Sequence, residues 1–266
     1  MNIRPCCLTV AGSDSGGNAG VQADLRAFHA YGLHGCTVFA ALTAQNPFGV
    51  SAIHAVPSDF VAAQLDAVLG VYSIKALKTG MLAAPETIDV IADRLAEHPE
   101  IAKVIDPVMI ATSGAKLISD DAMEVVKAKL LPLATLITPN LPEAETLSGL
   151  RGEGRSADVE WARELARRLY DGYGCAVLVK GGHGVNSAAV DVLFDGRDYA
   201  EFAAPWIANP VSTHGTGCSL AAALAAELAL GRGVSAAVKG AKDYVHQSIA
   251  NSYFVGPDCG VLGFVK

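Results

Sequence analysis

Short apolar runs alternate with helical segments along most of the chain, and no other feature constrains the fold as strongly. Residues 6–11 and 36–42 have the length and apolar character of buried strands, and residues 74–79 are expected to form a further strand. Residues 58–72 have helical spacing. Strands that alternate with helices pair in parallel through right-handed crossovers, and the helices cover both faces of the sheet. We therefore predict a three-layer αβα sandwich with a mostly parallel central sheet, built from residues 1–266 as a single domain.

Polar or glycine-rich stretches follow most of the predicted strands. Ligands of parallel sheets bind beyond the carboxyl ends of the strands, so these stretches are expected to share one edge of the sheet. They are residues 12–20, 43–49, 80–82, 106–114, 138–143, 180–184 and 212–218. Other expected elements are a turn-rich loop at 43–49, one helix over 120–131, a hairpin of 190–194 with 199–202, and a last helix over 235–253.

The composition argues against several classes of protein. Of the 266 residues, 51% are hydrophobic and 18% are charged, which indicates a large buried core. The formal net charge of −7 argues against a nucleic-acid surface. No apolar run approaches the roughly 18–20 residues that span a membrane, and the apolar stretch near the start is too short for a signal peptide. The six cysteines form no C-x-x-C pair, so we expect neither a disulfide framework nor a zinc site, and a cytoplasmic location.

The stretch 211–218, Val-Ser-Thr-His-Gly-Thr-Gly-Cys, runs directly into an Ala/Leu-rich helix. The first N–H groups of a helix lack partners and its dipole favours negative charge, so this turn predicts an anion-binding site. Gly215 and Gly217 let an anion approach the backbone closely. Cys218 lies where the helix field lowers a thiol pKa, so we expect it to accept a proton. The alternative interpretation is a tight turn whose small residues let the helix pack against the sheet.

Four further side chains suggest phosphate or metal chemistry. Asp106 ends a buried strand, where an unpaired carboxylate would be costly, so it needs a partner or a metal. Asn140 and Glu143 lie on one side of a helix start, where the carboxylate either holds Mg²⁺ through water or is an ordinary N-terminal charge. Lys180 ends an apolar strand before two glycines and fits a phosphate contact.

Other candidates are less specific. Asp24, one helical turn into a helix, either faces the site or faces water. His183 and His214 are candidates for acid–base work, but we favour loop imidazoles bonded to carbonyl groups. The loop at 12–20 lacks the Lys-Ser/Thr pair of a Walker A motif, and no G-x-G-x-x-G fingerprint occurs in the chain.

Taken in order, these motifs closely resemble those of the hydroxymethylpyrimidine kinase/phosphomethylpyrimidine kinase family of thiamine biosynthesis, within the ribokinase-like superfamily. The resemblance covers nearly the whole chain, and it rests on the order of many motifs that are individually weak. The motifs are Ala11-Gly12-Ser13-Asp14-Ser15-Gly16-Gly17, Ala19-Gly20-Val21-Gln22-Ala23-Asp24, Ala44-Gln45-Asn46, Lys78-Thr79-Gly80-Met81, Asp106-Pro107-Val108-Met109, Thr138-Pro139-Asn140-Leu141-Pro142-Glu143-Ala144, Lys180-Gly181-Gly182-His183 and Thr213-His214-Gly215-Thr216-Gly217-Cys218.

The resemblance implies a ribokinase-like fold, often dimeric, and an enzyme that uses ATP and Mg²⁺. Such an enzyme phosphorylates the hydroxymethyl group of 4-amino-5-hydroxymethyl-2-methylpyrimidine and then extends the monophosphate to the pyrophosphate. The residues that it implies for the pyrimidine pocket are Gly12, Asp24, Gln45, Met81 and Val108. Those that it implies for metal, nucleotide and phosphates are Asp106, Glu143, Asn140, Lys180 and Thr213, with Gly215, Thr216, Gly217 and Cys218 as the anion hole. The amide of Gln45 suits an aminopyrimidine edge because it offers one donor and one acceptor.

The sequence departs from the family pattern at three positions. Asn18 replaces a glycine that is common in the first loop, and Ser212 replaces a residue that is often asparagine. Thr112 stands where a lysine often follows the Asp-Pro-Val-Met motif, so a flap contact to phosphate is expected to be missing and the second phosphorylation to be affected.

Three other functions fit parts of the pattern. A pyridoxal kinase shares the fold, but the stretch 110–113 lacks the flap cysteine that some of those enzymes carry. A non-catalytic pyrimidine-binding regulator would not need Cys218, Lys180 and Glu143. An NAD-dependent oxidoreductase would carry the missing dinucleotide fingerprint. The expected partner is therefore a small-molecule pyrimidine, with no nucleic acid and no membrane, and the resemblance implies a homodimer.

Overall fold

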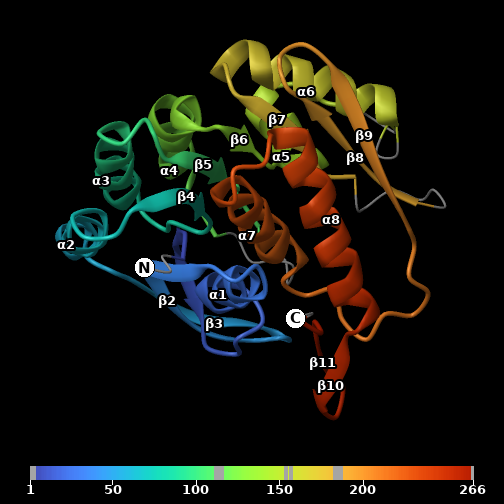
Figure 1. The fold of residues 1–266 in the computed structure, drawn as a ribbon, viewed down its shortest axis with the longest axis horizontal. Coiled ribbons are helices and arrows are strands. Elements are labelled where there is room, and N and C mark those ends of the chain that lie inside the picture. The colour runs from blue at the N-terminus through green and yellow to red at the C-terminus, as the bar shows by residue number, and fades with distance from the viewer. Residues whose placement is uncertain (1–3, 111–116, 153–154, 156–157, 182–187, 265–266) are drawn as a thin grey trace.

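A nine-stranded sheet forms the centre of the computed structural model, which describes residues 4–110, 117–152, 155, 158–181 and 188–264 (Figure 1). In order across the sheet, the strands are β3 (Gly49–Ala55), β2 (His34–Asn46), β1 (Cys6–Asp14), β4 (Ile74–Thr79), β5 (Ala102–Ile105), β6 (Leu136–Ile137), β7 (Ala176–Val179), β8 (Ala188–Phe194) and β9 (Tyr199–Pro205). Neighbouring strands are parallel in the part of the sheet that runs β2-β1-β4-β5-β6-β7. On either side of this part, β3 is antiparallel to β2 and β8 is antiparallel to β7. The predicted mostly parallel sheet is confirmed.

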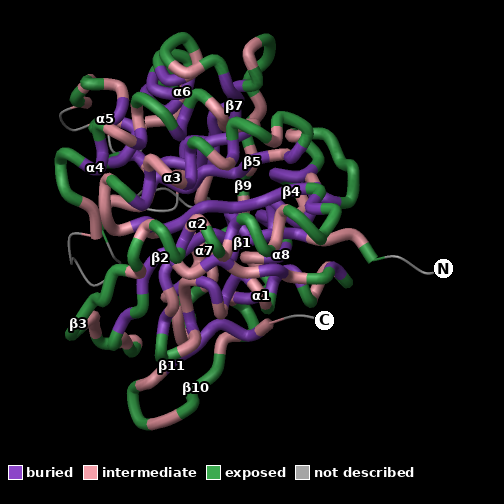
Figure 2. The backbone as a smooth tube through the Cα atoms, turned by 90° about the vertical axis from the view of Figure 1, so that its left-hand side faces the viewer, coloured by how far each residue is buried: buried purple, intermediate pink, exposed green. Residues whose placement is uncertain are grey.

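Helices cover both faces of the sheet, as predicted, and each layer buries its own apolar core. The first layer contains α2 (Ser58–Leu69), α3 (Pro85–Ala96), α4 (Asp120–Val125), α5 (Leu141–Ser148) and α6 (Val159–Tyr173). The second contains α1 (Gly20–Ala30), α7 (Thr216–Ala229) and α8 (Val234–Ala250). The arrangement is a three-layer αβα sandwich, and Figure 2 shows its buried backbone running through the middle of the molecule.

The helix α7 is the most enclosed element of the second layer. It packs on α8, α1 and β4, and nearly all its buried side chains are alanine or leucine. Alanine side chains let a helix come close to its neighbours. The Ala-rich sequence therefore places the start of α7 directly over the carboxyl ends of the central strands.

Three expected elements differ in the structure: the loop at 43–49, the helix over 120–131 and the last helix over 235–253. The predicted loop at 43–49 is wrong for its first half, because β2 continues to Asn46 and turns back into β3. The predicted helix over 120–131 is α-helical only to Val125, and continues as a π-helical turn, Val126–Leu130, and a 3₁₀ turn, Leu131–Leu133. Pro132 has no N–H to donate, which agrees with the end of α-helical geometry before it.

A small hairpin near the carboxyl end, β10 (Tyr253–Gly256) with β11 (Cys259–Val261), had no counterpart in the sequence prediction. It projects from the end of α8 (Figure 1), which itself stops at Ala250 rather than near Tyr253. The expected hairpin around Asp195 is confirmed as β8 and β9. Among the described residues no helix is long and apolar enough to cross a membrane, and the six cysteines are free.

Candidate active site

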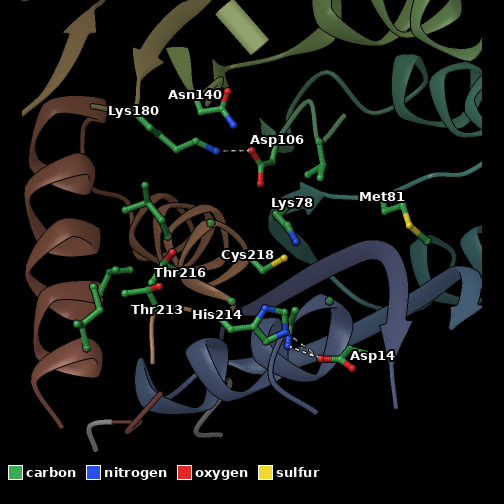
Figure 3. Close-up of a pocket in the computed structure, with 18 of the residues that line it drawn as sticks. Asp14, Lys78, Met81, Asp106, Asn140, Lys180, Thr213, His214, Thr216 and Cys218 are labelled. Carbon is green, nitrogen blue, oxygen red and sulfur yellow. Dashed lines mark hydrogen bonds and ion pairs between the residues drawn. The ribbon is translucent and has the colours of Figure 1, made fainter. Parts of the chain in front are cut away.

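A cavity of about 510 Å³ lies beyond the carboxyl ends of the parallel strands. It collects side chains from most of the stretches that were expected to share this edge, including those after β1, β4, β5, β6 and β7 and the turn before α7 (Figure 3). Thirteen of the fourteen predicted site residues line it. They are Gly12, Gln45, Met81, Asp106, Val108, Asn140, Glu143, Lys180, Thr213, Gly215, Thr216, Gly217 and Cys218.

The turn before α7 has the geometry of an anion site. Gly215 is the N-cap, with φ of +89°, and a Cβ there would collide with the carbonyl oxygen of Asn18, so glycine is required. The helix begins at Thr216, and its first N–H groups have no carbonyl within the helix to bind. At Gly217 a Cβ would meet a single neighbour, Lys180 Nζ, at 4.0 Å. The space above Gly217 is therefore open cavity, faced by backbone donors on one side and an ammonium group on the other.

Lys180 links this turn to two carboxylates. Its Nζ donates to Asp106 Oδ1 at 2.9 Å and lies 4.0 Å from Glu143 Oε2, while Thr138 Oγ1 donates to the same Asp106 oxygen at 3.1 Å. Burial opposes the charge of Lys180, but the neighbouring carboxylates outweigh it and raise the pKa of the amine. Lys180 is therefore protonated, and Asp106 has the partner that its buried position required.

Glu143 is the N-terminal helix charge that one of its two interpretations predicted, and its place at the cavity leaves the magnesium role a prediction. It closes a capping box with Asn140: Asn140 N–H donates to Glu143 Oε2 at 2.8 Å, and Glu143 N–H donates to Asn140 Oδ1 at 2.9 Å. The carboxylate also lines the cavity. Burial, with Asp106 nearby, raises the pKa of Glu143 in spite of the attraction of Lys180.

Two carboxylates at this point fit one kind of metal ion. No cluster of three or more His, Cys, Asp or Glu side chains placed to hold a metal occurs in the part of the chain that the structure describes. Mg²⁺ is usually bound by one or two carboxylates together with water and substrate phosphates. Asp106 and Glu143 beside an open anion site match that donor set.

Asp24 does not lie in the wall of the pyrimidine pocket, where the family resemblance placed it. Asp24 is fully buried and is not among the residues that line the cavity. Its carboxylate accepts from Lys78 Nζ at 3.0 and 2.9 Å and from Thr9 Oγ1 at 2.6 Å. A desolvated carboxylate needs these partners, and Lys78, not Asp24, reaches the cavity.

The expectation that the helix start lowers the pKa of the Cys218 thiol is also wrong. Burial raises the pKa of the Cys218 thiol, with Lys78 pulling it down and Asp24 and Asp106 adding to the rise. Figure 3 shows the sulfur turned toward Lys78. The thiol is therefore neutral at rest, because desolvation outweighs the favourable field of the helix start.

Four of the five residues implied for a pyrimidine line the cavity, and Figure 3 shows one of them, Met81, on the side away from Lys180 and Thr216. Gly12 is tightly packed against Met81, because a Cβ at Gly12 would lie 2.7 Å from Met81 Cε. Gln45 is fixed through its backbone: its N–H donates to Ser15 Oγ, and Ser15 Oγ donates to its carbonyl, both at 2.8 Å. Gln45, Met81 and Val108 share the wall of the cavity with Gly12.

Several lining residues were not found from the sequence. Lys78 was quoted only as part of a motif, although a lysine inside an apolar strand is a signal of a buried partner. Asp14 accepts from the N–H groups of Gly16, Asn18 and Ala19, at 2.8, 2.9 and 2.8 Å. Burial opposes its ionisation, but these donors and His214 lower the pKa of Asp14.

The histidine predictions have different outcomes. His214 Nε2 lies 3.9 Å from Asp14 Oδ2, so the expected carbonyl partner is wrong: the imidazole faces a carboxylate and lines the cavity (Figure 3). His183 and Thr112 lie outside the described residues. Ser212 Oγ accepts from the N–H of His214 at 3.2 Å and so keeps the turn closed.

The part of the cavity that does not contain Gln45 and Met81 is largely apolar, and no sequence pattern predicted it. Its walls come from β8, from β9 and the segment after it, and from α7 and α8. The lining residues there are Ala189, Ala204, Trp206, Ile207, Pro210, Leu220, Val245, His246 and Ile249. Such residues are dispersed along the chain and become neighbours only through the fold.

Comparison with known proteins places the chain among kinases of small molecules. A family model described as phosphomethylpyrimidine kinase matches residues 14–262. The hydroxymethylpyrimidine/phosphomethylpyrimidine kinase of Rhizobium meliloti is 46% identical over 243 residues, which are 91% of this chain and 90% of the relative. The thiamine biosynthesis bifunctional protein ThiED of Geobacter sulfurreducens is 49% identical over 98% of this chain. The chain spans 52% of that relative's length.

A solved structure shares the whole fold. The ADP complex of Bacillus subtilis pyridoxal kinase superimposes with a TM-score of 0.89 at 33% identity, covering 98% of both chains. The fold is therefore ribokinase-like, as the sequence motifs implied. It is shared by enzymes that act on different small molecules, so the choice of acceptor depends on the side chains of the cavity.

Proposed function

Because the chain belongs to the phosphomethylpyrimidine kinase family, we propose that it phosphorylates 4-amino-5-hydroxymethyl-2-methylpyrimidine and then the resulting monophosphate, with ATP as donor. The observation that carries this proposal is the open space over Gly217. There the start of α7 faces Lys180, Asp106 and Glu143. The same cavity has an apolar part lined from β8, β9, α7 and α8, and a part that contains Gln45 and Met81, and we call these its two arms. A donor and an acceptor that enter from the two arms meet over Gly217.

Phosphoryl transfer requires mainly positioning and stabilisation of charge. The N–H groups of residues 215–218 and the Lys180 ammonium group supply fixed positive potential over Gly217, and their positions do not change during the reaction. Asp106, Glu143 and Asn140 would hold the metal and phosphates on the other side. Bound Mg²⁺ would neutralise phosphate charge and orient the transferring group.

The acceptor hydroxyl needs a route for its proton in the first step. Cys218 is the third residue of α7, and it lies next to Lys78 in the wall of the cavity. We assign it as the proton acceptor for the alcohol, acting through the small thiolate fraction that Lys78 favours. The second step uses a phosphate oxygen that is already ionised at neutral pH, since its second pKa is about 6.

The apolar arm lined from β8, β9, α7 and α8 suits the adenosine part of ATP, and Thr213 lies close to Thr216 at the start of α7 (Figure 3). Apolar walls with a few polar groups are typical of cofactor sites. The arm around Gln45, Met81 and Val108 then receives the pyrimidine, and the amide of Gln45 reads its amino group and ring nitrogen.

A direct test measures ADP release with three acceptors: the hydroxymethylpyrimidine, its monophosphate and pyridoxal, with the products identified by mass spectrometry. We expect turnover of both pyrimidines and a kcat/KM for pyridoxal at least tenfold lower. A pyridoxal kinase would show the reverse order. A binding protein would show affinity for the pyrimidine without ADP release, and either result would overturn the proposal.

Two further expectations concern the enzyme in the cell. We propose a homodimer formed through the outer strand β3, whose residues are largely exposed and whose neighbourhood carries the exposed apolar side chains of Phe48 and Ile53. Light scattering would test this. We also propose that residues 1–266 form one domain that works in the cytoplasm, where six free thiols are stable.

A further inference from the structure

The hydroxyl of Thr43 lies between two oxygen atoms. Thr43 stands on β2 with 9% of its surface exposed, and its Oγ1 lies 2.7 Å from the carbonyl oxygen of Ser13 and 3.1 Å from Gln45 Oε1. Thr43 and Gln45 both line the cavity. Thr43 is absent from the residues implied for catalysis or binding, yet it contacts the side chain that is expected to choose the base.

One proton cannot serve both neighbours. A threonine hydroxyl donates a single hydrogen bond. The oxygen of Ser13 is a main-chain carbonyl, which can only accept, and it lies at the shorter of the two distances. With that proton given to Ser13, Thr43 Oγ1 and Gln45 Oε1 would face each other as two acceptors. A half-turn of the carboxamide exchanges Oε1 for Nε2, which donates to Thr43 Oγ1 and removes the conflict.

The backbone of Gln45 cannot move away from Thr43 to relieve this conflict. Ser15 Oγ bonds both the N–H and the carbonyl of Gln45 at 2.8 Å, and Ser13, the acceptor of the Thr43 proton, is fixed by Gln22 Nε2 at 2.9 Å through its own hydroxyl. The main chain of Gln45 is therefore held in place, and the contact with Thr43 leaves open which end of the carboxamide faces the hydroxyl.

We propose that Thr43 is a positioning residue that fixes the polarity of Gln45: one Nε2–H donates to the Thr43 hydroxyl, while Oε1 and the second Nε2–H face the pyrimidine as acceptor and donor. This inference rests on the proposed function. It names the chemical class that the cavity selects: a ring with an exocyclic amino donor beside a ring-nitrogen acceptor. An exocyclic oxo group beside a ring N–H presents the opposite pattern and meets an acceptor with an acceptor.

The test uses two pyrimidines that differ only in this pattern: 4-amino-5-hydroxymethyl-2-methylpyrimidine and its 4-oxo analogue. Dissociation constants are measured by calorimetry, and kcat/KM by ADP release, for the wild type and for Thr43→Val, Thr43→Ala and Thr43→Ser. Valine keeps the shape and loses the hydroxyl, alanine provides a smaller variant if valine disturbs the strand, and serine keeps the hydroxyl.

We expect the preference for the amino compound, in both binding and kcat/KM, to fall at least tenfold in Thr43→Val and Thr43→Ala, mostly through a gain by the 4-oxo analogue. The released carboxamide can then turn to suit either ring. Thr43→Ser is expected to keep the wild-type preference.

Equal losses for both pyrimidines in Thr43→Val and Thr43→Ala would overturn the inference and leave Thr43 a purely structural residue. So would a wild type that binds the two compounds equally well. A wild type that binds with the expected preference but releases no ADP would instead contradict the proposed function and leave the role of Thr43 standing.

Discussion

Lys78 donates to both carboxylate oxygens of Asp24, at 3.0 and 2.9 Å, and neither side chain is exposed to solvent. Burial opposes the charge of the amine, but Asp24 outweighs it and raises the pKa of Lys78. The pair connects β4 to α1 and places a fixed cation beneath Cys218.

Removing one member of this pair should destabilise the fold strongly. Lys78→Met leaves an uncompensated buried carboxylate, and we expect the free energy of unfolding to fall by about 3–5 kcal/mol in urea titrations. Lys78→Met combined with Asp24→Leu should recover part of this loss. The matched control is Lys239→Met, because Lys239 and Asp243 form an exposed pair that contributes less than about 1 kcal/mol. Equal losses in Lys78→Met and Lys239→Met would contradict this account of the pair.

Gln45 is expected to set the choice of base. Gln45→Leu leaves the amino group and ring nitrogen of the pyrimidine without partners, at a cost on the order of 1–3 kcal/mol in kcat/KM. The ratio of kcat/KM for the pyrimidine to that for pyridoxal should fall by the same factor. A parallel loss for both acceptors would show that Gln45 does not read the base.

The two phosphorylations should depend differently on Cys218 and on pH. Because burial raises the pKa of the thiol, its thiolate fraction increases with pH throughout the range from 7 upward. We expect kcat/KM of the first step to rise with pH over this range, and the second step, with its ionised phosphate acceptor, to stay nearly flat.

Cys218→Ala keeps the backbone donors and removes only the thiol. It should slow the first step far more than the second and remove the alkaline rise, as measured with each acceptor separately at saturating Mg²⁺ and ATP. An equal effect on both steps would mean that Cys218 shapes the site without taking a proton.

The parts of the fold that follow from local patterns were predictable. The strand expected over residues 74–79 and the hairpin expected around Asp195 both lie where they were predicted. The π-helical turn at Val126–Leu130 and the hairpin at Tyr253 depend on packing partners that local sequence does not reveal. Strand β2 ran past its predicted end because pairing with β3 satisfies the backbone of residues 43–46.

Within the site, the sequence predicted the positions of the residues better than their protonation states. The motif order brought Lys180, Asp106 and Gly217 to one cavity. The pKa of Cys218 was predicted with the wrong sign because its burial by distant residues could not be seen in the chain. Asp24 was placed in the pocket because its motif implied it, whereas its buried partner Lys78 lies 54 residues away. The apolar arm of the cavity is assembled from four separate segments and had no local signal.

The central claim is that the transferring phosphoryl group occupies the space between Gly217 and Lys180. Turnover of Gly217→Val tests it most directly, because a side chain at this position extends into that space, where a Cβ would lie 4.0 Å from Lys180 Nζ. Gly172→Val is the matched control, since Gly172 is an exposed helical glycine with nothing within 4 Å of its would-be Cβ. We predict that Gly217→Val folds and binds the hydroxymethylpyrimidine as the wild type does, but loses at least about 100-fold in kcat, on the scale known for removing an oxyanion donor, while Gly172→Val retains activity. A folded Gly217→Val enzyme with turnover close to that of Gly172→Val would contradict the account.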